Sequence, residues 1–324
     1  MFLFESIPWY SALMWIAVVG ALMLANEAAR ANKWVGLSLF LALPLALTIF
    51  VWPTTAGAGS STGTWFHWVK VYSSLAGCLG FMALRFIPGL IKNKFALMFP
   101  AAILALNIFE AVIRDFQVYG LNGHIDGVMM VGGPWNIMNG VAGLLNLLTI
   151  CGWAGIFISR GKKKDMIWPD MLWFWIIAYD LWNFAYVYNC VGDHAFYAGA
   201  ALLVSCTIPA FFIKRGAWLQ HRAQTLAFWM MFTMAFPAFV GESTFAVKSS
   251  NDPTALFVVS AIALAANLAV VIYQVMKIVQ GKCNPLKDEL YRDLPAYQKV
   301  VEANRPLASQ GILDADTPEA ALAG

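Results

Sequence analysis

The feature that most constrains this sequence is a succession of apolar blocks of about 20 residues, the length that an α-helix needs to cross a hydrocarbon core roughly 30 Å thick. Hydrophobic residues make up 60% of the 324 residues and charged residues only 12%, against about 25% in an average soluble chain. These proportions exclude a cytoplasmic enzyme, a nucleic-acid-binding protein and a disordered chain. The sequence predicts an all-α membrane protein that crosses the bilayer several times.

Nine such blocks are present, and we expect each to form one transmembrane helix. The predicted spans cover residues 8–27, 34–52, 67–88, 95–114, 135–158, 171–191, 195–213, 223–246 and 254–277. Residues 1–281 would then form one transmembrane helical bundle. Residues 282–324 follow as a cytoplasmic C-terminal tail, in which the charged stretch from Lys287 to Arg305 predicts a short helix and the last part predicts disorder.

The distribution of Lys and Arg predicts the orientation of these spans. Basic residues follow every odd-numbered span, namely Arg30, Lys33, Lys92, Lys94, Arg160, Lys162, Lys163, Lys164, Lys214, Arg215, Lys277, Lys282 and Lys287. Of the 21 basic residues only Lys70, Arg114 and Lys248 lie toward the other side, so the remaining 18 mark one face. By the positive-inside rule, the N-terminus is expected outside and the C-terminus in the cytoplasm.

Spans four to seven carry a pattern that indicates an internal repeat. The ends of spans five and seven, residues 151–161 and 206–216, both begin with Cys and finish with Arg-Gly. In the spans before them, the pair Asn107 and Glu110 has the same spacing as the pair Asp180 and Asn183, with amide and carboxylate exchanged. One interpretation is that spans 4-5 and 6-7 are two copies of one helical hairpin. The alternative is that spans ending in the cytoplasm share such endings by coincidence.

Ionisable side chains at membrane depth are candidate functional residues, because a charge there costs about 2.5 to 3.5 kcal/mol. Asp180 lies roughly 14 Å along span six, near its middle, and Asn183 follows one turn later. In span four, Asn107, Glu110 and Arg114 share one helix face, and Glu110 and Arg114 have the i, i+4 spacing of an ion pair. We interpret Asp180 as a midplane charge and the Glu110–Arg114 pair as an outer gate.

Further polar residues extend this set. Asn139 and Asn146 lie in span five, and Asn267 lies in span nine. Glu242 follows Pro237, where a broken helix would expose carbonyl groups able to coordinate a cation. If these side chains converge, they line a polar cavity that is open to the outside. The alternative for Asn146 and Asn267 is a hydrogen bond that only joins helices.

The sequence assigns no metal site, and the three histidines on the outer side, His67, His124 and His194, are the weak candidates for metal ligands. No HxxxH or HExxH spacing places two of them on one helix face, so the tertiary fold would have to bring them together. The fourth histidine, His221, is expected to contact solvent or lipid head groups. The sequence indicates no particular cofactor.

Two aromatic-rich segments carry a family resemblance. Residues 173–190 read WFWIIAYDLWNFAYVYNC, and residues 211–231 read FFIKRGAWLQHRAQTLAFWMM. They resemble an uncharacterised family of bacterial polytopic membrane proteins, a domain-of-unknown-function family. The resemblance implies the bacterial cytoplasmic (inner) membrane, and it implies no activity.

Three hypotheses for the function follow. The first is a transporter or channel-like protein for a small polar or cationic solute. The second is a non-catalytic membrane sensor or assembly subunit, and the third is a membrane-embedded enzyme with an outer-face metal site. The lipid bilayer is the one partner that the sequence requires. A homo-oligomer is left open, and the sequence does not assign an enzymatic activity.

Overall fold

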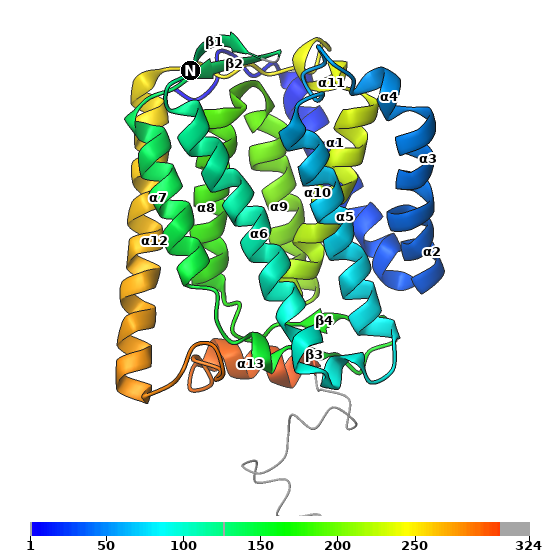
Figure 1. Cartoon of the computed structure of the whole chain (residues 1–324), viewed down its shortest axis with the longest axis vertical. Coiled ribbons are helices and arrows are strands. Elements are labelled where there is room, and N and C mark those ends of the chain that lie inside the picture. Colours follow the sequence, from blue (N-terminus) through cyan, green and yellow to red (C-terminus); the bar gives the residue numbers. More distant parts are fainter. Residues whose placement is uncertain (1, 126, 305–324) are drawn as a thin grey trace, which may run out of the picture.

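The structure is a computed structural model that describes residues 2–125 and 127–304 and is mostly helical. Figure 1 shows long helices that run roughly parallel, with the hairpin β1–β2 across one end of the bundle and α13 across the other. The N-terminus lies at the end that carries the β-hairpin. We refer to the two ends as the hairpin end and the α13 end.

Nine helical segments of at least 15 residues build the bundle in the described part of the chain. They are α1 (Trp9–Ala31), the continuous segment of α2 (Lys33–Leu37), η1 (Ser38–Ala42) and α3 (Leu43–Phe50), α5 (Trp65–Phe86), α6 (Lys94–Val118), α7 (Pro134–Leu148), α8 (Trp173–Cys190), the segment of η4 (Gly192–His194), η5 (Ala195–Ala201), α9 (Leu202–Ile208) and η6 (Pro209–Ile213), α10 (Trp218–Ala235) and α12 (Pro253–Gly281).

Shorter elements connect these segments. They are the helices α4 (Trp52–Thr55), η2 (Leu90–Lys92), η3 (Trp153–Gly155), α11 (Ala238–Gly241) and α13 (Pro295–Asn304), and the strands β1 (Asn122–Ile125), β2 (Val128–Val131), β3 (Phe157–Ile158) and β4 (Met166–Ile167). The four strands form two separate antiparallel hairpins, β1–β2 and β3–β4.

Five of the long segments, counted over the described residues, are long and apolar enough to cross a membrane. They are Trp9–Ala31, Lys33–Phe50, Lys94–Val118, Gly192–Ile213 and Pro253–Gly281. By contrast, α8 and α10 are buried over most of their length and carry polar side chains, because they pack inside the bundle against α12 and α5. The apolar helices identify the chain as a membrane protein by length and composition.

The predicted span at 135–158 is wrong in its second half. The helix α7 ends at Leu148, and the chain continues as a loop that contains η3 and β3. Gly152 has a left-handed φ of 65°, and a Cβ atom there would lie 2.0 Å from Oδ2 of Asp170. The apolar residues of this stretch, such as Phe157 and Ile158, are buried beneath the bundle. These residues are therefore apolar because they lie in a loop buried by the protein, and not because they belong to a membrane-spanning helix.

The two stretches that suggested a repeat differ in structure. Residues 151–161 contain η3 and β3, whereas residues 206–216 remain helical as far as Ile213. The helix observed in place of the predicted span 223–246 lies closer to the N-terminus. This helix, α10, begins at Trp218 and ends at Ala235, shortly before Pro237, which has no backbone N–H to continue the helix.

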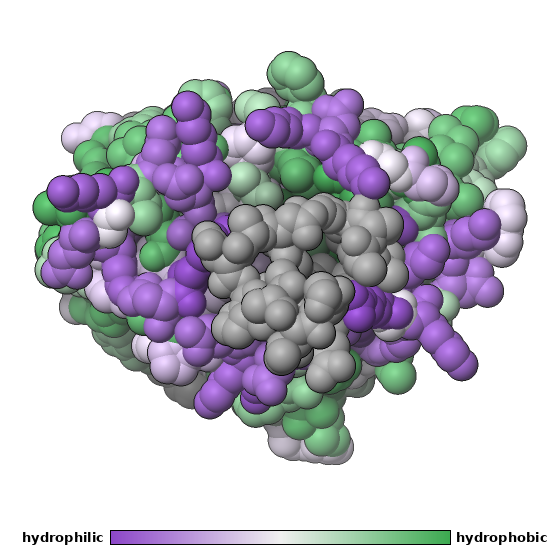
Figure 2. All heavy atoms as spheres, turned by 90° about the horizontal axis from the view of Figure 1, so that it is seen from below, coloured by the Kyte–Doolittle hydropathy of each residue, from purple (hydrophilic) through white to green (hydrophobic). Residues whose placement is uncertain are grey.

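The short helix expected in the C-terminal tail is present as α13. It is tied to the bundle because Asn304 Nδ2 donates to the carbonyl of Arg215 at 2.9 Å. Figure 2 views this end of the molecule, where hydrophilic residues gather. The part of the tail predicted to be disordered lies beyond the described residues.

Candidate ligand-binding site

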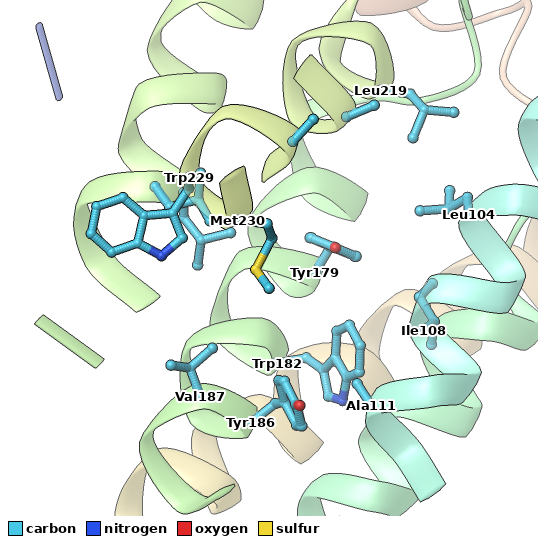
Figure 3. Close-up of a cluster of buried hydrophobic side chains, with 14 of the residues drawn as sticks. Leu104, Ile108, Ala111, Tyr179, Trp182, Tyr186, Val187, Leu219, Trp229 and Met230 are labelled. Atoms are coloured by element: carbon cyan, nitrogen blue, oxygen red, sulfur yellow. The ribbon is translucent and has the colours of Figure 1, made fainter. Parts of the chain in front are cut away.

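A cavity of about 70 Å³, which we call the central cavity, lies inside the bundle between α5, α6, α8, η5–α9 and α10. Its lining side chains are buried or half-buried. Apolar walls include Leu202, Leu226 and Met230. Figure 3 shows Tyr179 and Met230 projecting toward each other from α8 and α10. Two cationic side chains and no carboxylate line the cavity in the described part of the chain.

Arg222 is the first of these cations. It lies in the first turns of α10 and is only 5% exposed. Its Nε donates to the hydroxyl of Tyr179 at 3.3 Å and its Nη2 donates to Oδ1 of Asn183 at 3.1 Å. Its Nη1 is buried and has no hydrogen-bond partner. No carboxylate of the described residues lies within 4.0 Å of this guanidinium. Its direct hydrogen-bond partners are neutral, and Asp180 interacts with it electrostatically at longer range.

Lys70 is the second cation, and a carboxylate compensates it. Its Nζ lies 2.7 Å from Oε2 of Glu110 and donates to the backbone carbonyl of Asn107 at 3.0 Å. Glu110 therefore pairs with Lys70 of the neighbouring helix, and the predicted Glu110–Arg114 pair is wrong. Arg114 instead points Nη2 toward the sulfur of Met130 at 3.8 Å. Glu110 thus forms its ion pair with a lysine of the neighbouring helix and not with the arginine four residues later in its own helix.

Two histidines line the hairpin end of the cavity. The rings of His67 and His194 have their centroids 6.1 Å apart, and Nδ1 of His67 is hydrogen bonded to the hydroxyl of Thr64 at 2.8 Å. His124 does not join them, because it is exposed on β1. Among the described residues no group of three or more His, Cys, Asp or Glu side chains is arranged to hold a metal ion.

Asp180 does not line the central cavity. Its Oδ2 accepts a hydrogen bond from the hydroxyl of Thr207 on α9 at 2.7 Å, which joins two helices. Asn183, one turn further on, lines the central cavity and accepts a hydrogen bond from Arg222. Asp180 therefore has a helix-joining hydrogen bond outside the cavity lining and acts on Arg222 only at longer range. Glu242 is exposed beyond α11 and also lies outside the cavity.

The amides of α7 take part in interhelical hydrogen bonds. Asn139 Nδ2 donates to Oδ2 of Asp115 at 2.8 Å, and Asp115 is fully buried at the end of α6. Asn146 Nδ2 donates to Oδ1 of Asn267 at 2.9 Å. This bond joins α7 to α12, as in the alternative interpretation of these two residues. Neither Asn139 nor Asn146 reaches the central cavity.

A second, smaller cavity of about 30 Å³, which we call the lower cavity, lies between α5, α6 and α10. Ser74, Gly77 and Phe81 line it further along α5 toward the α13 end. Four residues line both cavities, namely Asn107, Tyr179, Arg222 and Leu226. They therefore form the boundary between the two spaces.

The α13 end below these cavities is closed by a buried polar network around Asp165. Arg30 donates from Nε and Nη2 to the two carboxylate oxygens of Asp165 at 3.0 and 3.1 Å. Gln220 Nε2 donates to the same carboxylate at 2.9 Å. Burial opposes the ionised form, but the hydrogen bonds and charge of Arg30 outweigh it and lower the pKa of Asp165 to about 2. The network joins α1, α10 and the β3–β4 hairpin.

His221 belongs to the same buried region, so its expected contact with solvent or head groups is wrong. It is fully buried, and its Nδ1 is hydrogen bonded to Nδ2 of Asn26 at 2.8 Å. The neighbouring residue Arg222 was likewise missed as a site residue, because the predicted span began at residue 223. The unbroken run of helix-compatible residues from Trp218 onward is the pattern that indicates the earlier helix start.

These features define a helical membrane protein with a positively charged interior cavity. Residues 5–303 match the model of a family of unknown function, DUF5692, and the chain belongs to that family. This match confirms the resemblance to an uncharacterised family. No match to the chain was found among curated proteins or among solved structures.

Proposed function

We propose that this protein spans the bacterial cytoplasmic membrane nine times, binds a small anion in the central cavity and carries it across the membrane. Support for the nine spans is that nine helical segments of at least 15 residues overlap the predicted spans and lie in one bundle. Support for the orientation is the concentration of basic residues at the α13 end, which includes Arg30, Lys163 and Arg215 and would face the cytoplasm.

The observation that carries the proposal is that the guanidinium of Arg222 has no ion-pair partner within 4.0 Å among the described residues. A buried charge without a counterion costs several kcal/mol, and the cost is larger in a membrane interior than near water. The Lys70–Glu110 pair is neutral as a unit, which leaves Arg222 as the net charge of the lining. An anion placed beside the free Nη1 would satisfy both the charge and the missing hydrogen bond. The cavity therefore favours an anion over the cationic solute expected from Asp180.

The volume restricts the ligand to a small one. A single water occupies about 10–15 Å³ in the same measure, and an engineered cavity of about 150 Å³ holds benzene. A cavity of about 70 Å³ suits an inorganic anion or a carboxylate of a few heavy atoms. The apolar walls would contact the uncharged part of such a carboxylate.

Transport is favoured over simple binding by the arrangement of the two cavities. Arg222 lies between the central cavity and the lower cavity, so an anion bound to its guanidinium could be released to either side. Beyond the lower cavity, the Asp165 network closes the α13 end. In the proposed orientation, the Asp165 network would lie on the cytoplasmic side of the site.

The test uses the full-length protein in liposomes and in detergent. We expect small anions such as formate, acetate, nitrate or chloride to raise the thermal unfolding temperature and at least one of them to be taken up. Arg222→Gln should abolish both effects, whereas Lys248→Gln, which removes an exposed cation, should leave them unchanged. Stabilisation by cations that is lost in Asp180→Asn would overturn the proposal. Binding without uptake would favour the sensor alternative.

A further inference from the structure

A second, independent site lies at the α13 end. A groove of about 330 Å³ runs between the start of α8, the end of η6 and the outer side of α13, and it is nearly five times as large as the central cavity. Its apolar wall includes Trp173 and Phe212, and its basic wall consists of Arg215 and Lys299. No Asp or Glu side chain of the described residues lines it.

The apolar wall faces outward from the protein. Phe212 is 82% exposed and Trp173 is 58% exposed. Both residues lie at helix ends on the α13 side, where the orientation proposed above places the cytoplasmic surface of the bilayer. Exposed aromatic rings at this level are favourable because they meet the boundary between acyl chains and head groups.

The basic wall lies on the side of the cytoplasm. Arg215 and Lys299 are exposed, and neither has an ion-pair partner among the described residues. The helix α8 begins at Trp173 without a side-chain cap, so its first N–H groups add positive potential to the same groove. The groove thus has an apolar wall toward the membrane and a positive wall toward the cytoplasm.

We propose that this groove binds an anionic phospholipid of the cytoplasmic leaflet. Its phosphate would lie between Arg215 and Lys299, and its acyl chains would run along Phe212 and Trp173. A soluble anion would use the basic wall and leave the apolar wall exposed, whereas a zwitterionic lipid would leave the two positive charges only partly neutralised. An anionic phospholipid complements both walls.

The test measures lipid retention by native mass spectrometry of the full-length protein, supplied with phosphatidylglycerol or phosphatidylcholine. Each cation near an anionic surface contributes enough that Arg215→Gln with Lys299→Gln should weaken phosphatidylglycerol binding by about ten- to thirtyfold. The matched control is Lys282→Gln with Lys287→Gln, which removes the same charge from exposed positions outside the groove and should change retention less than about twofold.

A third variant fills the groove without changing its charge. Ala296→Trp places a large ring into the space beside α13 and should also release phosphatidylglycerol, with the unfolding temperature of the lipid-free protein as the check on folding. Equal retention of phosphatidylcholine, displacement of the lipid by free glycerol phosphate, or unchanged retention in the double variant would overturn the proposal. If the lipid is retained only after removal of residues 305–324, the tail occupies the groove and the proposal is also wrong.

Discussion

Arg222 donates from Nη2 to Oδ1 of Asn183 at 3.1 Å, so a buried cation without a direct ion-pair partner is held by a neutral amide. The amide positions the guanidinium and leaves its positive charge available. A carboxylate at position 183 would form a permanent ion pair and occupy the place of an exchangeable anion. Asn183 is therefore a positioning residue whose neutrality is required for ligand binding in our proposal.

The variant Asn183→Asp tests this requirement. A fixed carboxylate next to Arg222 should stabilise the ligand-free protein by about 1.5–3 kcal/mol, the contribution of a hydrogen bond to a charged group. The same change should remove stabilisation by small anions. Thermal and denaturant unfolding in detergent, with and without the anion, measure both effects. Asn146→Asp is the control, because Asn146 bonds to Asn267 away from the cavity. An Asn183→Asp variant that still responds to anions like the parent protein would contradict this role.

The Lys70–Glu110 pair predicts a double-mutant cycle. Removal of one partner leaves the other charge buried at 5–7% exposure, so Lys70→Met or Glu110→Gln alone should cost about 3–5 kcal/mol of unfolding free energy. The double variant should recover a coupling energy of about 1–3 kcal/mol. The cycle of Glu110→Gln with Arg114→Met is the control and should show almost no coupling, because those side chains do not pair. Coupling to Arg114 as strong as coupling to Lys70 would show that the pairing is wrong.

The positions of most of the long helices could be predicted from the sequence, because a bilayer favours apolar segments of one length. Asn107 and Asn183, both predicted as site residues, do line the central cavity. The partner of each side chain could not be predicted in this way. Asp180 and Asn183 share one helix stripe, yet the first accepts a hydrogen bond from Thr207 and the second from Arg222, on two different neighbouring helices. Helix rotation depends on packing against several neighbours, which one sequence does not specify.

Arg222 and the predicted span at 135–158 show a second reason why the sequence did not predict every feature of the structure. Basic residues near the end of an apolar block are normally assigned to the membrane surface, and this rule excluded Arg222 from the helix interior although it is buried. Apolar runs are normally assigned to the bilayer, but Phe157 and Ile158 are buried by the protein's own α13-end segments. Hydropathy measures the preference for leaving water and does not distinguish lipid from protein as the alternative surroundings.

The ion pair of Asp165 with Arg30 at the α13 end should make the stability of the fold sensitive to acid. Its folded pKa of about 2 lies below the ordinary value of 3.8, so its ion pair with Arg30 stabilises the fold above pH 4 and is lost as the pH falls toward 2. A shift of this size corresponds to roughly 2 kcal/mol. Asp165→Asn should remove that dependence and lower the unfolding free energy at pH 7. Denaturant unfolding at pH 7 and pH 3 measures both. The same acid sensitivity in the variant as in the parent protein would exclude Asp165 as the responsible group.

Asp170 has the opposite dependence and controls how the C-terminal segment docks. Burial raises its pKa to about 7, although the N–H groups of Leu290 and Tyr291 donate to it at 2.7 and 3.3 Å. Because this folded pKa lies above the ordinary 3.8, the folded state binds more protons between pH 4 and 7, and stability falls as the pH rises through that range. The amides of Leu290 and Tyr291 should therefore have lower hydrogen-exchange protection at pH 8 than at pH 6, after correction for the intrinsic exchange rate.

The variant Asp170→Asn keeps a side-chain oxygen as acceptor and removes the titration. Protection of the segment should then become independent of pH, whereas Glu302→Gln, which changes an exposed acid of α13, should keep the pH dependence of the parent protein. Protection that rises between pH 6 and pH 8 in the parent protein would mean that the two N–H bonds favour the carboxylate more strongly than burial opposes it. In that case α13 would be held more tightly when Asp170 is ionised, and the sign of this prediction would be wrong.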